Sequence, residues 1–105
     1  MSTVSVIAVI TTKPGHRETI LEAFRANMPA VHAEDGCIEY APAIDADGMG
    51  SFQTPFGKDT FVVIEKWASK EHLMAHAAST HMKEYASKTK DLIADRTIHV
   101  LSSAT

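Results

Sequence analysis

The sequence has 105 residues, of which 45% are hydrophobic and 22% are charged, and its net charge is −3. This length predicts a single domain, residues 1–105, that buries roughly 60–65% of its unfolded surface, so a partner subunit would add useful burial. The composition excludes a disordered chain, and the acidic balance leaves no broad basic surface for nucleic acid. No apolar run approaches the ~20 residues that cross a bilayer, so we also expect no membrane association.

The N-terminal residues and the cysteine usage favour the cytoplasm. Residues 1–4 contain neither the basic nor the apolar region of a secretory signal. The single cysteine, Cys37, agrees with this compartment, because one cysteine alone forms neither an internal disulfide nor a cysteine-based metal site. We expect Cys37 to act as a small buried hydrophobic residue.

Residues 4–12 predict a strand whose two faces are both apolar. The segment is rich in β-branched side chains and is followed by a Lys-Pro-Gly turn at 13–15. A sheet with one face in water alternates apolar with polar residues, so this pattern indicates that both faces are covered. One face carries the even-numbered residues Val4, Val6, Ala8 and Ile10. The other face carries the odd-numbered residues Ile7 and Val9.

The next two segments predict a helix and an edge strand. From about Arg17 to Val31, apolar residues recur at helical spacing. Pro29 predicts a kink or a fresh turn near the end of this helix. Residues 37–44 alternate as a strand, and Pro42 favours an edge position because proline cannot donate a hydrogen bond to a neighbouring strand.

Residues 45–59 predict a long loop. Connections of this length are uncommon in compact domains and are often functional. The loop carries Phe52 and Phe56 among glycines. We expect it to act as a lid over a pocket or as an arm across a dimer interface, while an ordinary surface excursion stays open as the alternative.

The second half of the chain predicts a strand, two helical segments and a final strand. Residues 60–68 form the strand, and Ser69 is placed to cap the helix that follows. A break at residues 79–80 precedes a further run at helical spacing that extends to Ile93, and the last strand covers about 96–102. The order is therefore β-α-β-β-α-β. The helices can cover one face of a four-stranded antiparallel sheet, and the sheet of a second identical subunit can cover the other, which predicts a homodimer.

Four short motifs lie on these elements in a fixed order. They are Lys13-Pro14-Gly15, Glu34-Asp35-Gly36-Cys37-Ile38-Glu39-Tyr40, Glu65-Lys66-Trp67 and His76-Ala77-Ala78-Ser79-Thr80-His81. In order and spacing they resemble the K-P-G, E-x-G-C-x-x-Y, E-x-W and H-x-x-S-x-H motifs of the antibiotic biosynthesis monooxygenase family. The resemblance spans about residues 4–101 and implies an α+β, ferredoxin-like subunit that pairs into a dimeric α+β barrel.

The resemblance also implies an activity. Characterised members of the family act as cofactor-free oxygenases on quinols, anthrones and related small aromatic substrates. We therefore expect a monooxygenase that uses no cofactor. Active quinol oxygenases carry an Asn on the strand that bears their Trp, and residues 61–67 contain none. Two alternatives therefore stay open: a small-molecule isomerase that uses the same pocket, and a non-catalytic ligand-binding dimer.

Direct oxygenation requires a base that works near neutral pH and a dry cavity, because a deprotonated phenol is the better reductant of dioxygen. His76 and Trp67 match positions that active members use, so we expect His76 to remove a phenolic or enolic proton and Trp67 to line the pocket and donate its indole N–H. The predicted substrate-binding residues are Phe24, Tyr40, His81 and Tyr85. Core packing is the alternative role for the three aromatic residues, and helix initiation is the alternative for His81.

Two patterns that resemble metal sites are incomplete. His72 and His76 have a spacing that can hold zinc, but two ligands do not make a site. Asp45, Asp47 and Gly48 resemble the start of a calcium loop whose later ligands are absent, so they indicate a turn. We therefore expect no metal.

Overall fold

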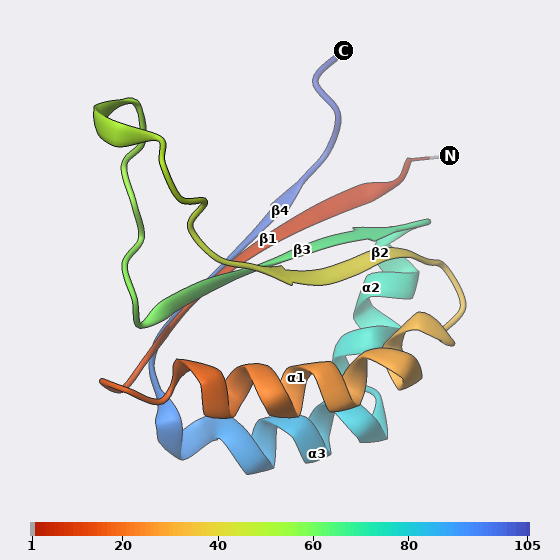
Figure 1. Cartoon of the computed structure of the whole chain (residues 1–105). Helices are drawn as coiled ribbons and strands as arrows, with labels where there is room; N and C mark the ends of the chain where they lie inside the picture. The colour runs from red at the N-terminus through yellow and green to blue at the C-terminus, as the bar shows by residue number, and fades with distance from the viewer. Residues whose placement is uncertain (1) are drawn as a thin grey trace.

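The computed structural model describes residues 2–105 and shows one antiparallel sheet with helices on a single face (Figure 1). The elements are β1 (Val4–Thr12), α1 (Arg17–His32), β2 (Cys37–Ala43), the 3-10 helix η1 (Gly50–Phe52), β3 (Thr60–Trp67), α2 (Lys70–Ala77), α3 (Thr80–Thr89), the 3-10 helix η2 (Lys90–Leu92) and β4 (Ile93–Leu101). This order confirms the predicted α+β, ferredoxin-like subunit. No helix within these residues is both long and apolar enough to cross a membrane.

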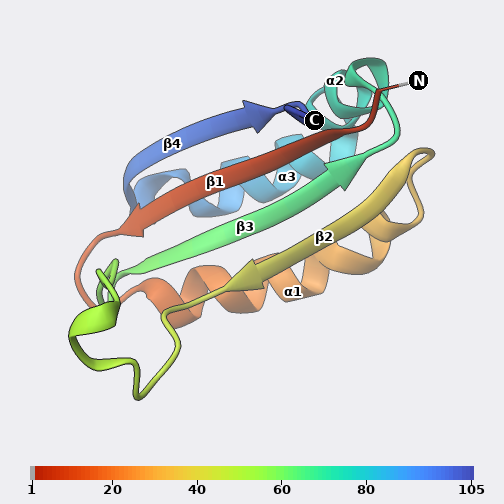
Figure 2. The same cartoon turned by 90° about the horizontal axis from the view of Figure 1, so that it is seen from above.

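The strands lie in the order β2-β3-β1-β4, and every neighbouring pair is antiparallel. β2 is an edge strand, which confirms the position predicted from Pro42. Figure 2 shows α1 under the β2 side of the sheet and α3 under the β4 side. The space between α3 and the central strands β1 and β3 is where the candidate site lies.

The two faces of the sheet differ in burial. The even-numbered residues of β1 are buried under the helices, and the register places the odd-numbered residues Phe61, Val63, Glu65 and Trp67 of β3 on the same face. The residues that α1 adds to this core are Ile20, Leu21, Phe24 and Val31. On the opposite face, Ile7, Val9, Val62 and Ile64 are half-buried. The chain's own helices therefore complete only one hydrophobic layer.

The structure bears on two expectations about helix boundaries. α1 continues through Pro29 to His32, so no fresh turn begins at the proline, and the alternative of a kink there stays a prediction. Proline has no backbone N–H, so α1 loses the one hydrogen bond that residue 29 would donate. The helix then ends within the same turn, at His32. Leu92 and Ile93 are not part of α3, because η2 intervenes and β4 begins at Ile93 instead of at 96. Ile93 pairs with Thr12 of β1, and this pairing with the sheet outweighs the helical spacing of the sequence.

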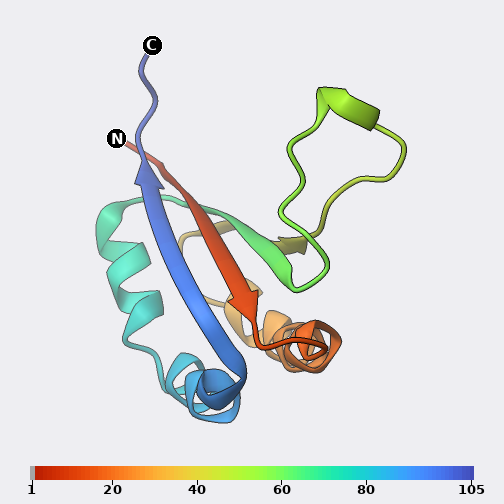
Figure 3. The same ribbon diagram turned by 90° about the vertical axis from the view of Figure 1, so that its left-hand side faces the viewer.

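The loop at residues 45–59 projects from the sheet on the side away from the helices (Figure 3). The Asp45 carboxylate closes its base by accepting hydrogen bonds from the backbone N–H groups of Phe56 at 3.0 Å and Gly57 at 2.8 Å. These two bonds lower the pKa of Asp45. Phe52 at the tip is 88% exposed. The loop is therefore tied at its base and presents an aromatic residue on the uncovered side of the sheet.

Candidate active site

A cavity of about 160 Å³ lies between the sheet and α3. Its wall includes the rings of Phe24, Tyr40 and Tyr85, three of the four predicted substrate-binding residues. At the β4 edge it is lined by Arg96 and Ile98, which are both exposed. Because a cavity of about 150 Å³ accommodates benzene, this space suits one aromatic ring.

The aromatic wall is rigid and its phenols stay protonated. Phe24 stacks on Tyr40, with ring centroids 4.8 Å apart and planes inclined by 12°. Tyr85 meets Phe24 edge to face at 6.0 Å. Burial raises the pKa of Tyr85 to about 12 and also raises the pKa of Tyr40. Both hydroxyl groups therefore remain hydrogen-bond donors at neutral pH.

Glu65 is the one acidic residue that the described part of the chain contributes to the cavity wall. It lies on the helix-facing side of β3, where alternation along the strand places it between Val63 and Trp67. Its Oε1 atom accepts the indole N–H of Trp67 at 2.9 Å. Its Oε2 atom accepts no hydrogen bond from residues 2–105, and Glu65 is one of the residues that line the cavity.

The protonation of Glu65 is set by opposing effects. Burial raises its pKa above the ordinary value, and the charge of Glu34 acts in the same direction. The hydrogen bond from Trp67 and the neighbouring His76 act against this rise, but burial dominates. A carboxyl group whose pKa is raised toward neutrality is suited to accept and return a proton during a reaction.

Trp67 and His76, the two predicted catalytic residues, lie behind the cavity wall. Trp67 is fully buried, and His76 is 4% exposed in the last turn of α2. Their rings are 4.5 Å apart, and the Nε2 atom of His76 is 4.0 Å from Oε1 of Glu65. Neither side chain lines the cavity. Both contact Glu65, which does line it.

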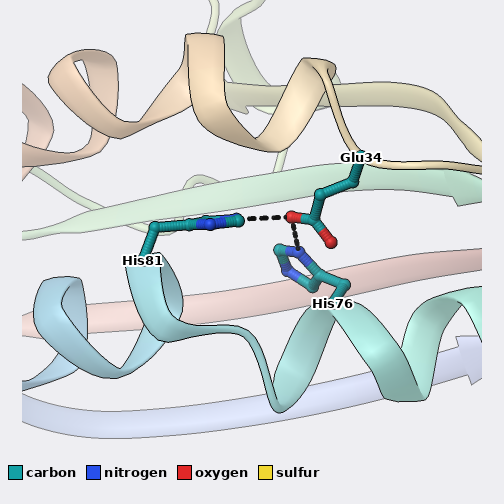
Figure 4. A group of neighbouring side chains, drawn as sticks. All are labelled: Glu34, His76 and His81. Atoms are coloured by element: carbon teal, nitrogen blue, oxygen red, sulfur yellow. Dashed lines mark hydrogen bonds and ion pairs between the residues drawn. The ribbon is translucent and has the colours of Figure 1, made fainter.

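A second carboxylate joins His76 to His81 (Figure 4). Glu34 lies in the turn between α1 and β2, His76 on α2 and His81 on α3. One oxygen of Glu34, Oε2, is 2.8 Å from Nδ1 of His76 and 2.7 Å from Nε2 of His81. His81 therefore lies outside the main cavity and borders a separate surface hollow, which it shares with Asn27, Glu84 and Lys88.

Local capping explains why these side chains converge. The Ser79 side chain accepts the N–H of Met82 at the start of α3 and donates to the carbonyl of His76 at 2.8 Å. This joint fixes α3 against the end of α2. At the other end of α2, Gly36 adopts a φ of +80°, and a Cβ atom there would overlap the ring of His72. Glycine therefore lets α2 dock against the turn that carries Glu34.

The geometry of the three-residue cluster is that of hydrogen bonds. Glu34, His76 and His81 are the group in residues 2–105 whose ligand atoms come close enough for a metal, all within 4.8 Å. Tetrahedral zinc holds its ligand atoms about 3.3 Å apart, whereas the contacts to Glu34 are 2.7 and 2.8 Å. His72 does not join the cluster, because its Nδ1 atom is 2.7 Å from the Ser69 hydroxyl.

Cys37 lies half-buried at the start of β2, packed against the core. Burial, together with the charges of Glu34 and Glu65, raises the pKa of its thiol. The group therefore stays a neutral thiol, as a residue with a packing role would.

Sequence reasoning assigned no role to Glu34 or Glu65, although both belong to the quoted motifs. The signal for Glu65 was the alternation of β3, because a glutamate in register with Phe61, Val63 and Trp67 must face the core. No comparable signal existed for Glu34, since the contact with His81 joins residues 47 positions apart.

This fold and the motifs that form the site are those of the antibiotic biosynthesis monooxygenases. The model of the antibiotic biosynthesis monooxygenase family matches residues 3–88, and the chain belongs to this family.

Several relatives resemble the chain over nearly its whole length. The Escherichia coli (strain K12) protein named "Probable quinol monooxygenase YgiN" is 40% identical over 99 residues, which cover 92% of this chain and 94% of the relative. The crystal structure of PA3566 from Pseudomonas aeruginosa matches with a TM-score of 0.81 and 25% identity, and covers 100% of this chain and 97% of that one. Rv0793 from Mycobacterium tuberculosis matches with a TM-score of 0.80 and 27% identity, at coverages of 99% and 97%.

Proposed function

We propose that this protein is a cofactor-independent monooxygenase that oxidises a quinol, an anthrone or a similar electron-rich aromatic. The observation that carries the proposal is the position of Glu65 on the wall of an aromatic-lined cavity, with an Oε2 atom that accepts no hydrogen bond from the described residues. The name of the E. coli relative, a quinol monooxygenase, supports the substrate class.

The proposed reaction starts with proton transfer to Glu65. The phenolic O–H bond of the substrate breaks and an O–H bond forms on the carboxylate, which leaves an anion that reduces dioxygen more readily. One oxygen atom enters the ring and the other leaves as water, so that quinol and dioxygen give a hydroxyquinone and water. The substrate supplies all four electrons, and no external reductant is required. The apolar wall favours this sequence because it keeps water away from the reactive anion.

All the predicted site residues except His81 have a place in this scheme. His76 takes over the proton that Glu65 accepts. It therefore acts as a base toward Glu65 and does not contact the substrate itself. Trp67 holds Glu65 in position through its indole N–H. Tyr85 is available as a neutral donor to a substrate oxygen, with Phe24 as the apolar wall. The Tyr40 hydroxyl donates to Met82 Sδ at 3.9 Å and would exchange this weak bond for one to the substrate. The cationic side chains of Lys90 and Arg96, which also line the cavity, favour an anionic intermediate.

We also propose that the chain works in the cytoplasm as a homodimer of single-domain subunits, paired through the uncovered face of the sheet. Aliphatic side chains line that face, and a second copy would bury them. The 45–59 loop supports this arrangement, because it projects on the same side of the sheet (Figure 1) and carries the exposed Phe52. The loop then acts as an arm of the dimer.

Oxygen uptake tests the proposal. The purified protein is mixed with a naphthoquinol or an anthrone under air, and uptake is corrected for spontaneous oxidation. We expect protein-dependent uptake that Glu65→Gln reduces by about 10²–10⁴-fold, the usual range for loss of a general base. Glu22→Gln, an exposed change on α1, is the matched control and should leave the rate unchanged.

Product analysis separates the competing functions. With ¹⁸O₂, a monooxygenase places one labelled atom in the hydroxyquinone, whereas simple oxidation to quinone releases hydrogen peroxide and no labelled organic product. Turnover of a hydroxy-ketone without oxygen would instead favour the isomerase. Binding of the quinone with no turnover of any of these compounds would favour the ligand-binding dimer.

A further inference from the structure

Four polar side chains form a line from the cavity wall to the surface of α3. In order they are Glu65, His76, Glu34 and His81, and the successive contacts measure 4.0, 2.8 and 2.7 Å. Carboxylates alternate with imidazoles along the line. Four different elements supply them: β3, α2, the turn after α1, and α3. The arrangement is therefore created by the tertiary fold, because no single element supplies more than one of the four side chains.

Exposure along this line is lowest at His76 and rises from there to His81. The side chains of Glu65 and His76 are 10% and 5% exposed, that of Glu34 is 14% exposed, and that of His81 is 28% exposed. His81 borders the surface hollow between α1 and α3, whose lining shares only Tyr85 with that of the cavity. The line thus connects a buried carboxylate with solvent at a hollow other than the cavity that Glu65 lines.

We propose that Glu65, His76, Glu34 and His81 form a proton relay between the closed cavity and solvent. The inference rests on the proposed function, and it adds Glu34 and His81 as positioning and proton-carrying residues that do not touch the substrate. An imidazole accepts a proton on one ring nitrogen and releases another from the second. His76 faces Glu65 with Nε2 and Glu34 with Nδ1, which is the orientation such a transfer requires.

The first contact is the longest, and the relay requires that ligand binding shorten it. At 4.0 Å, Glu65 and His76 form an ion-pair contact that is too long for a hydrogen bond. Catalytic contacts of this kind are often long in the unliganded protein and tighten when the substrate binds. The remaining two contacts already have hydrogen-bond length.

A relay has a purpose because the cavity is apolar and small. A substrate ring that fills about 160 Å³ shuts Glu65 off from water on the cavity side. Quinol and dioxygen give hydroxyquinone and water with no net release of protons, so the relay returns one proton for each that it takes. It stores the proton outside the cavity while the anion reduces dioxygen, and it resets Glu65 to a carboxylate before the next turnover.

The first test does not depend on activity. NMR of the ¹⁵N-histidine-labelled full chain measures how fast the ring N–H proton of His76 exchanges with water. A relay that ends at His81 predicts that His81→Gln, which keeps a donor toward Glu34 but cannot pass a proton on, slows this exchange at least tenfold. His16→Gln is the control, because His16 is an exposed histidine at the start of α1. Equal exchange rates in all three proteins would overturn the relay.

The second test measures its role in turnover. With a naphthoquinol as probe, His81→Gln should lower kcat at least fivefold while KM stays within twofold, and added imidazole should restore the rate of His81→Ala. An unchanged kcat in an active wild-type protein would remove the relay from catalysis. Wild-type uptake at the rate of the blank would count against the monooxygenase proposal instead, and the exchange measurement would still decide whether the proton path exists.

Discussion

The two faces of the sheet are built from the same strands but have different chemistry. On the helix-covered face, the apolar series of β3 is interrupted by Glu65, and this carboxylate is joined by Trp67, His76 and Glu34. On the opposite face, β3 presents Val62 and Ile64 and no acid before the strand end. Polar groups are tolerated in the core where the chain's own helices provide their partners, because an unpaired buried carboxylate is costly. The centre of the open face, around Ile7, Val9, Val62 and Ile64, has no such partners and offers aliphatic surface for packing.

This contrast predicts that the open face serves association and the covered face serves chemistry. A change on one face should therefore leave the property of the other intact. Three measurements test this separation, from the largest expected effect to the smallest.

The largest effect is expected at the open face. Ile64→Arg places a charge at the centre of the proposed interface, where its burial without a partner should weaken the dimer by about 100-fold or more. Sedimentation velocity over a concentration series measures the change. Thr19→Arg adds the same charge on the exposed surface of α1 and should leave association unaltered. An Ile64→Arg protein that associates like the wild type would place the interface elsewhere or show that the chain is a monomer.

An intermediate effect is expected at Trp67. Trp67→Phe keeps an aromatic ring but removes the N–H that Glu65 accepts, so we expect kcat for quinol oxidation to fall by about tenfold, which corresponds to the loss of one hydrogen bond to a charged group. Phe61→Leu is the matched control, because Phe61 is equally buried on the same face of β3 and makes no contact with Glu65 in the described structure. If both variants lose activity in proportion to their loss of thermal stability, Trp67 is only a packing residue.

The smallest effect is a dependence of stability on pH. Burial raises the pKa of Glu65 above 4.5, so the folded protein holds this proton after the unfolded chain has lost it. The free energy of unfolding of the wild type should therefore fall relative to that of Glu65→Gln as the pH rises from about 4.5, by at most about 1.4 kcal/mol per pH unit. Urea denaturation between pH 4.5 and 6 measures the difference. A wild type that gains stability relative to the variant over this range would mean that its pKa is lowered instead.

Much of the fold was predictable because it depends on local patterns. The β-branched segment 4–12, the helical spacing after Arg17 and the cap at Ser69 all rest on interactions within a few residues, and each predicted element is present. The error in the start of β4 occurred where a distant partner competes with a local preference. Ile93 leaves the helical pattern because it pairs with Thr12, 81 positions earlier in the chain.

The candidate site was predictable only in part. Phe24, Tyr40 and Tyr85 were identified as wall residues, and the cavity joins them. His76 and Trp67 were placed next to the substrate, whereas the structure inserts Glu65 between them and the cavity. Which atom of a side chain faces which neighbour depends on how α2 and α3 are oriented against the sheet, and no spacing in the sequence records that orientation.

The sequence by itself determined the element order, the edge position of β2 and the apolarity of both faces of β1, because periodicity and backbone preference act over short distances. Only the tertiary structure decided that Glu34 lies between His76 and His81 and that Glu65 alone of these groups reaches the cavity. The reason is physical: a buried acid or histidine is stabilised by whichever partner packing brings within hydrogen-bond reach, and here that partner lies 42 to 47 residues away along the chain.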